Sequence, residues 1–293
     1  MQLDHRPVIY RFEGYPLQPD KGLDSLDDPA RLRLLCEGDS WFSVGALPVT
    51  SNLLMGLRFW RETLLVSLAR PGDTLLNMSD LSANPQLRLL IADRKFQSKW
   101  DAILLSGGGN DLIDRADRII CKPGPGAGGS MHDYIDSAEL ADFRADLQAG
   151  YRAIAALRAG SKNENTPIVT HVYDYPTPRD APVKFFGFAT PSGPWLYRAL
   201  KFREVPERLW ATISDHLFET LASTLAELGD RRRPDAIPNF HVVKATRNTL
   251  TRAALHTTGP DGDWENEIHP TPAGYDKLGQ VISAELAVLL GGV

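Results

Sequence analysis

Four segments of this 293-residue chain carry the side chains that acyl transfer requires. The hydroxyl of Ser40 is a poor nucleophile until a base takes its proton, and a histidine such as His269 can do so near neutral pH. The tetrahedral intermediate then needs fixed hydrogen-bond donors, each worth about 3–4 kcal/mol. We expect these donors to be the backbone N–H groups of Ser40 and Gly72 and the side-chain N–H of Asn110. These residue types predict a serine nucleophile with an oxyanion hole.

Short apolar runs precede these residues and predict the strands that position them. The runs are residues 33–37, 64–68, 102–106, 168–173 and 241–245. Helical stripes run over 143–154, 209–225 and 275–289, and the last has Thr271 as its expected cap with Pro272 in its first turn. Alternating strands and helices form parallel sheets, which bind ligands at the carboxyl ends of their strands. We therefore expect the four chemical segments to meet at one edge of such a sheet.

These four blocks, in this order, resemble the SGNH (GDSL-type) hydrolases. The family name spells out block residues that are matched here by Ser40, Gly72, Asn110 and His269, and Trp41 stands where the GDSL nickname has leucine. The resemblance covers the core, from about residue 31 to 290. It implies a three-layer, flavodoxin-like α/β fold with helices on both faces of a parallel sheet of order 2-1-3-4-5. It also implies hydrolysis of carboxylic esters or thioesters through an acyl-enzyme on Ser40, with no metal or cofactor.

One residue departs from the family pattern. The family has an aspartate three residues before the catalytic histidine, and this chain has Asn266 there. An amide oxygen can accept the Nδ1 proton of His269, but it cannot offset the charge of the imidazolium. The spacing favours Asn266 as the third catalytic residue, with Glu267, Asp263 or a backbone carbonyl as alternatives. The same substitution motivates an alternative function, a non-catalytic SGNH-fold binding protein with a degenerate site.

The regions outside the four blocks predict one domain with additions. Residues 1–30 are polar and rich in Asp and Pro, and we expect an arm that lies on a single hydrolase domain, 31–293, without joining its sheet. Insertions are expected near 121–130 and 176–195. The predicted walls of the substrate pocket are Trp41, Phe185, Phe186 and Trp195, with packing over the core as the alternative role for the aromatic residues of the second insertion.

Composition excludes several classes of function. The net charge is −5 and the pI about 5.8, without the clustered basic residues that nucleic acid binding needs. The glycines of 124–129 match G-x-G-x-x-G, but a proline interrupts them and no clear strand precedes them, so dinucleotide binding is not expected.

The remaining features concern partners and compartment. The two cysteines, Cys36 and Cys121, predict no disulfide framework and no metal site. The start of the chain has no apolar leader and no segment is long enough to span a membrane, so the expectation is a cytoplasmic protein, with export by a signal-less route left open. We expect a small-molecule ester as the partner. The sequence leaves its acyl and alcohol groups open, and also the oligomeric state.

Overall fold

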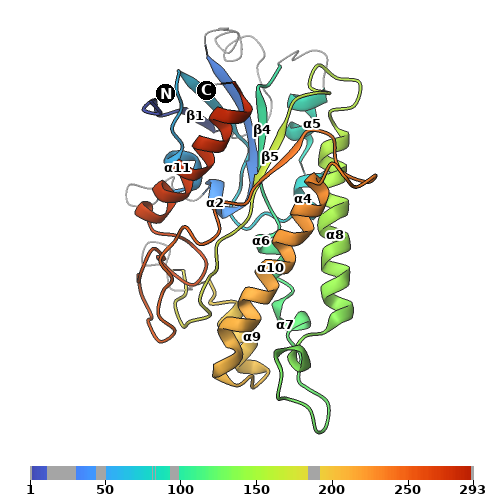
Figure 1. Cartoon of the computed structure of the whole chain (residues 1–293), viewed down its shortest axis with the longest axis vertical. Coiled ribbons are helices and arrows are strands. Elements are labelled where there is room, and N and C mark those ends of the chain that lie inside the picture. The colour runs from blue at the N-terminus through green and yellow to red at the C-terminus, as the bar shows by residue number, and fades with distance from the viewer. Residues whose placement is uncertain are drawn as a thin grey trace.

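The sheet has six parallel strands (Figure 1). The computed structural model of the chain describes residues 2–11, 31–43, 51–80, 82, 84–92, 99–183 and 192–291. The strands are β1 Val8–Arg11, β2 Leu32–Gly38, β3 Thr63–Ser67, β4 Ala102–Ser106, β5 Ile168–His171 and β6 Phe240–Val243. Their order across the sheet is β1-β3-β2-β4-β5-β6. The five predicted strands correspond to β2–β6, and their order is the expected 2-1-3-4-5.

The edge strand β1 corrects one expectation. It comes from the region expected to lie outside the sheet, and its residues pair in register with Leu64 to Ser67 of β3. This strand has only four residues, and Val8 and Tyr10 expose 65% and 53% of their surface. It is therefore too short and too exposed to be recognised in the sequence as a buried strand. The backbone of β3 would otherwise present an open edge, and pairing with β1 satisfies its hydrogen-bonding groups.

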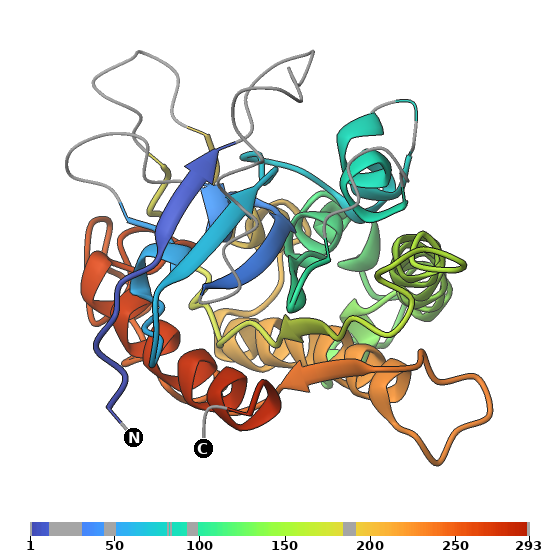
Figure 2. The ribbon, with the colours of Figure 1, turned by 90° about the horizontal axis from the view of Figure 1, so that it is seen from above.

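Helices cover both faces of the sheet, as the view from above shows (Figure 2). On one face α3 packs against α11, and on the other α8 packs against α4 and α10. The helices are α2 Ser40–Ser43, α3 Leu53–Gly56, α4 Leu75–Ser79, α5 Pro85–Ala92, α6 Gly109–Ile113, α7 Ala116–Ile119, α8 Ser137–Ala156, α9 Leu196–Phe202, α10 Trp210–Gly229 and α11 Pro272–Leu289, with short 3-10 turns η2 Met131–Tyr134 and η3 Glu207–Leu209. The three-layer α/β architecture is therefore confirmed.

The last helix begins and packs as its sequence predicts. The Thr271 side chain accepts a hydrogen bond from the backbone N–H of Gly274 at 3.1 Å, which caps α11. Further along, Gly279 lies against Gly56 of α3, and a Cβ built on Gly279 would come within 2.3 Å of the Gly56 backbone. Because α11 starts three residues after His269, this close contact also fixes where the segment carrying His269 ends.

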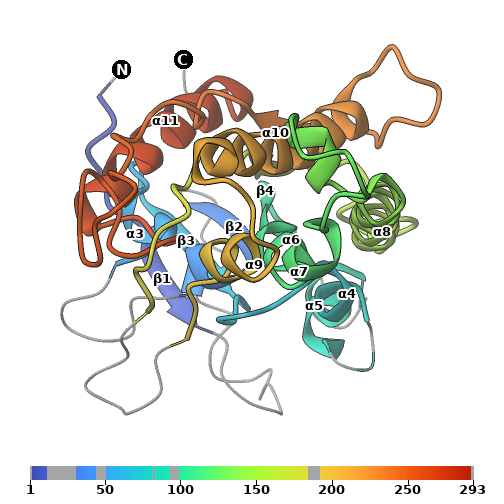
Figure 3. The same ribbon diagram turned by 90° about the horizontal axis from the view of Figure 1, so that it is seen from below.

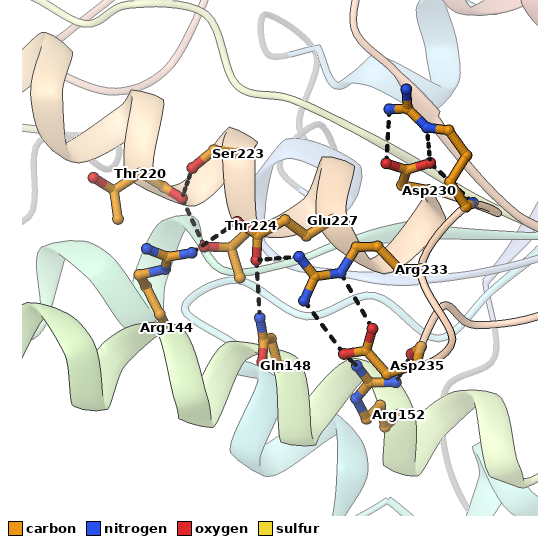
Figure 4. Close-up of polar contacts among 11 residues, drawn as sticks. Arg144, Gln148, Arg152, Thr220, Ser223, Thr224, Glu227, Asp230, Arg233 and Asp235 are labelled. Atoms are coloured by element: carbon orange, nitrogen blue, oxygen red, sulfur yellow. Dashed lines mark hydrogen bonds and ion pairs between the residues drawn. The ribbon is translucent and has the colours of Figure 1, made fainter.

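Polar side chains join α8 to α10 and the loop that follows it (Figure 4). Arg144 of α8 pairs with Glu227 of α10 at 2.9 Å, and Gln148 donates to the same carboxylate at 3.4 Å. Arg152 of α8 pairs with Asp235 at 3.1 Å. These side chains are partly exposed to solvent, so they connect the two helices at the surface rather than in the core.

Both insertions are loops, in so far as they are described. The 121–130 loop is closed at its base, where the Cys121 N–H donates to the Tyr134 carbonyl at 2.9 Å. In the second insertion, Val183 and Ser192 form an isolated antiparallel bridge. Phe185 and Phe186 lie outside the described residues. Within the described part of the chain, no helix is both long enough and apolar enough to cross a membrane.

Candidate active site

Ser40 lies at the carboxyl edge of the sheet, where β2 turns sharply into α2. Figure 3 looks onto this edge, with α6, α7 and α9 in front of the strands. Gly38 permits the turn, because a Cβ there would lie 2.8 Å from the Ser106 carbonyl oxygen. Asp39 then fixes the loop: its backbone N–H donates to the Ser106 carbonyl, and its carboxylate accepts from the Trp41 N–H, both at 3.0 Å. The turn places the Ser40 hydroxyl at the strand end, as the sequence predicts for a nucleophile.

His269 bridges Ser40 and Asn266. Its Nε2 lies 2.8 Å from Ser40 Oγ, and its Nδ1 lies 3.0 Å from Asn266 Oδ1. That amide oxygen also accepts the backbone N–H groups of Ile268 at 3.1 Å and of His269 at 3.0 Å. Only an oxygen can accept these N–H bonds, so the amide orientation is fixed and Nδ1 carries the proton. Nε2 therefore presents its lone pair to the Ser40 hydroxyl.

Burial sets the charge state of this group. Ser40 and His269 each expose only 7% of their surface, and desolvation lowers the pKa of His269 to about 4. Asn266 is neutral and does not oppose that shift. The imidazole is consequently uncharged at neutral pH and free to accept a proton.

The two acidic alternatives for the partner of His269 are bonded elsewhere. Glu267 is fully buried, but its carboxylate accepts three backbone N–H groups at the start of α9. Desolvation raises its pKa to about 7. Asp263 binds Lys277 Nζ at 2.6 Å and accepts the Thr251 N–H at 2.7 Å. The geometry thus favours Asn266 among the candidates.

Besides Ser40, the expected oxyanion-hole residues are Asn110 and Gly72, which come from two further turns at this edge of the sheet. Asn110, in the first turn of α6, lines a pocket together with Ser40, and its Nδ2 donates to the Asp73 carbonyl at 2.8 Å. An amide nitrogen carries two hydrogens, so a second remains for a ligand. Gly72 lies at the exposed tip of the turn after β3, with a φ of +77° that favours glycine. This turn is attached to β2 through a 2.9 Å bond from the Arg70 N–H to the Gly38 carbonyl.

A small, mainly apolar pocket opens beside Ser40. Its lining residues are Asp39, Ser40, Trp41, Gly109, Asn110, Ile113, Tyr173, Asp174, Pro176, Phe218, Trp264 and Ile268. Of the two predicted wall residues that the structure describes, Trp41 belongs to this set and Trp195 does not. Trp195 instead precedes α9, where its backbone N–H donates to Glu267.

Phe218 and Trp264 are walls that sequence reasoning missed. Phe218 belongs to α10, and its neighbours Leu217 and Leu221 had marked that segment only as a core helix. Trp264 stands in the block before His269, where the sequence indicates partners for His269 but no pocket wall. Pocket walls from such distant segments have no common sequence signal.

A buried cluster of aromatic and polar side chains packs against the loop that carries Ser40. The Trp41 ring stacks on His171 at 5.6 Å between centroids, and its Nε1 donates to the Ile268 carbonyl at 3.1 Å. The Tyr173 hydroxyl donates to Asp39. Desolvation raises the pKa of Asp39 to about 6 and lowers that of His171 to about 4. Trp41 therefore ties the loop of Ser40 to the loop of His269, a role that goes beyond the predicted wall.

Among the described residues, no group of three or more His, Cys, Asp or Glu side chains could hold a metal ion.

Comparisons with known proteins find similarity in structure. No protein-family model matches the chain, and no curated protein matches it in sequence. A possible lipase from Chitinophaga pinensis superposes with a TM-score of 0.51 at 14% identity, over 88% of this chain and 98% of that one. An extracellular lipase from Streptomyces rimosus gives a TM-score of 0.47 at 15% identity, over 86% and 99%. The first comparison shows a shared fold, so the fold that the SGNH resemblance implied is confirmed.

Proposed function

We propose that this protein is a serine hydrolase that cleaves carboxylic esters or thioesters through an acyl-enzyme on Ser40. The observation that carries the proposal is the continuous hydrogen-bonded series from Ser40 through His269 to Asn266. Its polarity suits a base that takes the serine proton, because Nδ1 is a donor and Nε2 an acceptor. The Chitinophaga protein of the same fold is described as a possible lipase, and lipases also cleave esters.

The proposed first half-reaction forms the acyl-enzyme. Ser40 Oγ attacks the carbonyl carbon of the substrate while His269 Nε2 accepts the hydroxyl proton. The oxyanion is stabilised by the backbone N–H groups of Ser40 and Gly72 and by the side-chain N–H of Asn110. The tetrahedral intermediate then collapses: the bond to the alcohol or thiol breaks, and His269 gives its proton to that leaving group.

The second half-reaction returns the serine. A water molecule attacks the acyl carbonyl and gives a proton to His269, the same donors stabilise the second oxyanion, and the bond from the acyl group to Ser40 Oγ breaks. His269 then returns the proton to Ser40, and a carboxylic acid leaves. The apolar pocket walls, Ile113 and Phe218 among them, suit the acyl chain rather than a charged group.

In both half-reactions the imidazolium forms next to a neutral amide. Asn266 holds the ring in the required orientation, but it contributes no charge to stabilise the cation. We therefore propose that catalysis at this site depends on the orientation of the His269 ring more than it would with an aspartate as partner. The low pKa of His269 also keeps the base unprotonated in mildly acidic solution.

A fluorophosphonate probe tests the proposal, because it labels only an activated serine. We expect labelling of the parent protein at Ser40, located by peptide mass spectrometry, together with hydrolysis of p-nitrophenyl esters. Ser40→Ala is the matched control and should show neither. A parent protein that is folded, unlabelled and inactive over a series of acyl-chain lengths would instead support the alternative, a non-catalytic binding protein.

A further inference from the structure

The loop that carries His269 is held by a single buried arginine of the 176–195 insertion. Arg179 exposes none of its surface. Its Nη2 donates to the backbone carbonyls of Asn266 at 2.9 Å and Trp264 at 3.3 Å. Its Nη1 donates to Thr257 Oγ1 at 3.0 Å and to the Gly259 carbonyl. One guanidinium therefore joins the two ends of the segment that leads into the catalytic loop.

The catalytic loop holds the insertion in return. Glu267, directly after Asn266, accepts the N–H groups of Leu196 at 3.2 Å and Tyr197 at 2.7 Å, and also that of Trp195. Its own backbone N–H donates to the Ala181 carbonyl at 2.9 Å. We call the two side chains and these bonds the Arg179–Glu267 clasp. It fixes both ends of the insertion to the segment from Trp264 to Glu267, which includes Asn266.

Burial of the two charged side chains of the clasp costs free energy that a purely structural contact need not spend. Both a guanidinium and a carboxylate are removed from water, each bonded to backbone groups, and well-packed apolar side chains often fix a loop at least as well as buried charged groups do. What the charged groups add is direction, because a guanidinium presents several donors in one fixed plane. Here one of those donors binds the carbonyl of Asn266, the residue that orients the imidazole.

We propose that Arg179 is a positioning residue, which sets the orientation of His269 by holding the backbone of its neutral partner. This inference rests on the proposed function. An aspartate would attract the imidazolium by its charge over a range of geometries, whereas Asn266 acts only through the direction of its Oδ1. Misplacement of that oxygen by about 1 Å can reduce turnover on the order of 100-fold. In this role the described part of the insertion is a fixed brace of the catalytic loop, not a movable lid.

Arg158 provides a matched control. It exposes 4% of its surface, and its guanidinium also donates to backbone carbonyls, those of Ala155, Thr166 and Pro238. Thr166 and Pro238 precede β5 and β6, so this arginine lies at the amino edge of the sheet, opposite Ser40. Replacement of Arg158 by lysine should disturb packing without any effect on His269.

The experiment compares Arg179→Lys with Arg158→Lys by the rate of fluorophosphonate labelling, by kcat and KM for a p-nitrophenyl ester, and by Tm. We expect Arg179→Lys to lower kcat and the labelling rate by about 10- to 100-fold with KM nearly unchanged, because lysine keeps the charge but loses the planar fork. The acid limb of its pH profile should stay where the parent has it. Arg158→Lys should lower Tm and leave kcat within about twofold.

Chemical rescue gives a second, independent readout. In Arg179→Ala, added guanidinium at about 10–50 mM should restore part of the lost kcat, whereas equal concentrations of urea or methylammonium should not, because only guanidinium has both the charge and the fork. If Arg179→Ala does not fold, Arg179→Lys alone decides. Parent-like labelling of a folded Arg179→Lys, or an equal loss of kcat in Arg158→Lys, would overturn the proposal. A parent protein that is itself unlabelled and inactive would refute the proposed function instead.

Discussion

The two edges of the sheet use buried polar side chains in different ways. At the amino edge these side chains bond mainly to the backbone: Asn163 Nδ2 donates to the Ile91 carbonyl at 2.9 Å, and Thr166 Oγ1 lies 3.1 Å from the Trp100 carbonyl and 3.2 Å from Asn163 Oδ1. At the carboxyl edge some side chains also bond to the backbone, as Arg179 and Glu267 do, but others bond to one another in series, as in the 2.8 Å contact of His269 with Ser40. Bonds to the backbone join segments of the fold, whereas a series of side chains with alternating donors and acceptors can move a proton. The comparison predicts that substitutions reduce stability at one edge and activity at the other.

The largest expected effect belongs to the nucleophile. Ser40→Ala should lower kcat/KM by more than about 1,000-fold, since loss of a catalytic serine removes the covalent route. The free energy of unfolding should change little, because the residue ends a strand and the loop is held by Asp39. Steady-state kinetics and urea unfolding measure the two quantities. Turnover equal to that of the parent would contradict the mechanism.

Arg158→Ala should have the opposite profile. The carbonyls of Thr166 and Pro238 lose their guanidinium donor, whereas that of Ala155 keeps the Arg158 backbone N–H. Each unsatisfied buried group costs about 1–3 kcal/mol, so we expect a loss of roughly 3 kcal/mol in the free energy of unfolding. The kcat/KM of the folded protein should stay within about twofold. Urea unfolding followed by tryptophan fluorescence measures the loss. A large loss of kcat/KM in fully folded protein would break the distinction between the two edges.

Substitutions of Asn266, the partner of His269, should have an intermediate effect on kcat/KM and should change its dependence on pH. Asn266→Ala should lower kcat/KM by roughly 10- to 100-fold, because the ring loses its acceptor. Asn266→Asp should keep or raise the plateau of kcat/KM, because the carboxylate favours the imidazolium. The same attraction raises the pKa of His269 from about 4 toward its ordinary value, and the base must be neutral to act. The acid limb of kcat/KM should therefore move to higher pH.

The matched measurement is kcat/KM from about pH 3.5 to 8 for parent, Asn266→Asp and Asn266→Ala. Ala variants at Glu267 and Asp263 complete the set. A silent Asn266→Ala beside a strongly impaired Glu267→Ala would contradict the assignment of Asn266.

The smallest effect is expected in the surface network between α8 and α10 (Figure 4). Arg144 and Glu227 keep 40% and 30% of their side chains exposed, and ion pairs of this kind contribute about 0–1 kcal/mol. Glu227→Gln should thus change the free energy of unfolding by less than about 1 kcal/mol, and less still in high salt. It should not alter kcat/KM. A larger or salt-independent change in the free energy of unfolding would show that this network behaves as buried ion pairs do.

The sequence predicts the strands and the helix that position the site better than it predicts the residues that line the pocket. The order of β2–β6 and the start of α11 at Thr271 follow from apolar runs and a cap, because these are local patterns. Ser40 and His269 fall in blocks that end at one edge of a parallel sheet, so their proximity could be expected. The edge strand β1 has an apolar run of only three residues, Val8 to Tyr10, and its pairing with β3 is what reveals it.

The choice among partners of His269 and the origin of the pocket walls needed three-dimensional distances. Asn266, Glu267 and Asp263 lie within four positions of each other, and their side chains diverge in ways that spacing does not determine. Likewise Arg179 sits in a proline-rich insertion with no motif around it. Its role depends on carbonyls nearly ninety positions further along the chain.

One bond of the clasp also bears on how the protein ages. Asparagine converts to aspartate when the backbone nitrogen of the next residue attacks its side-chain carbonyl carbon. In this chain that nitrogen belongs to Glu267, and its N–H donates to the Ala181 carbonyl while Arg179 holds the carbonyl of Asn266. Rotation of the backbone around this bond is opposed by both contacts. We therefore expect deamidation of Asn266 to be slower in the folded chain than in the unfolded one, so that the neutral partner of His269 is retained.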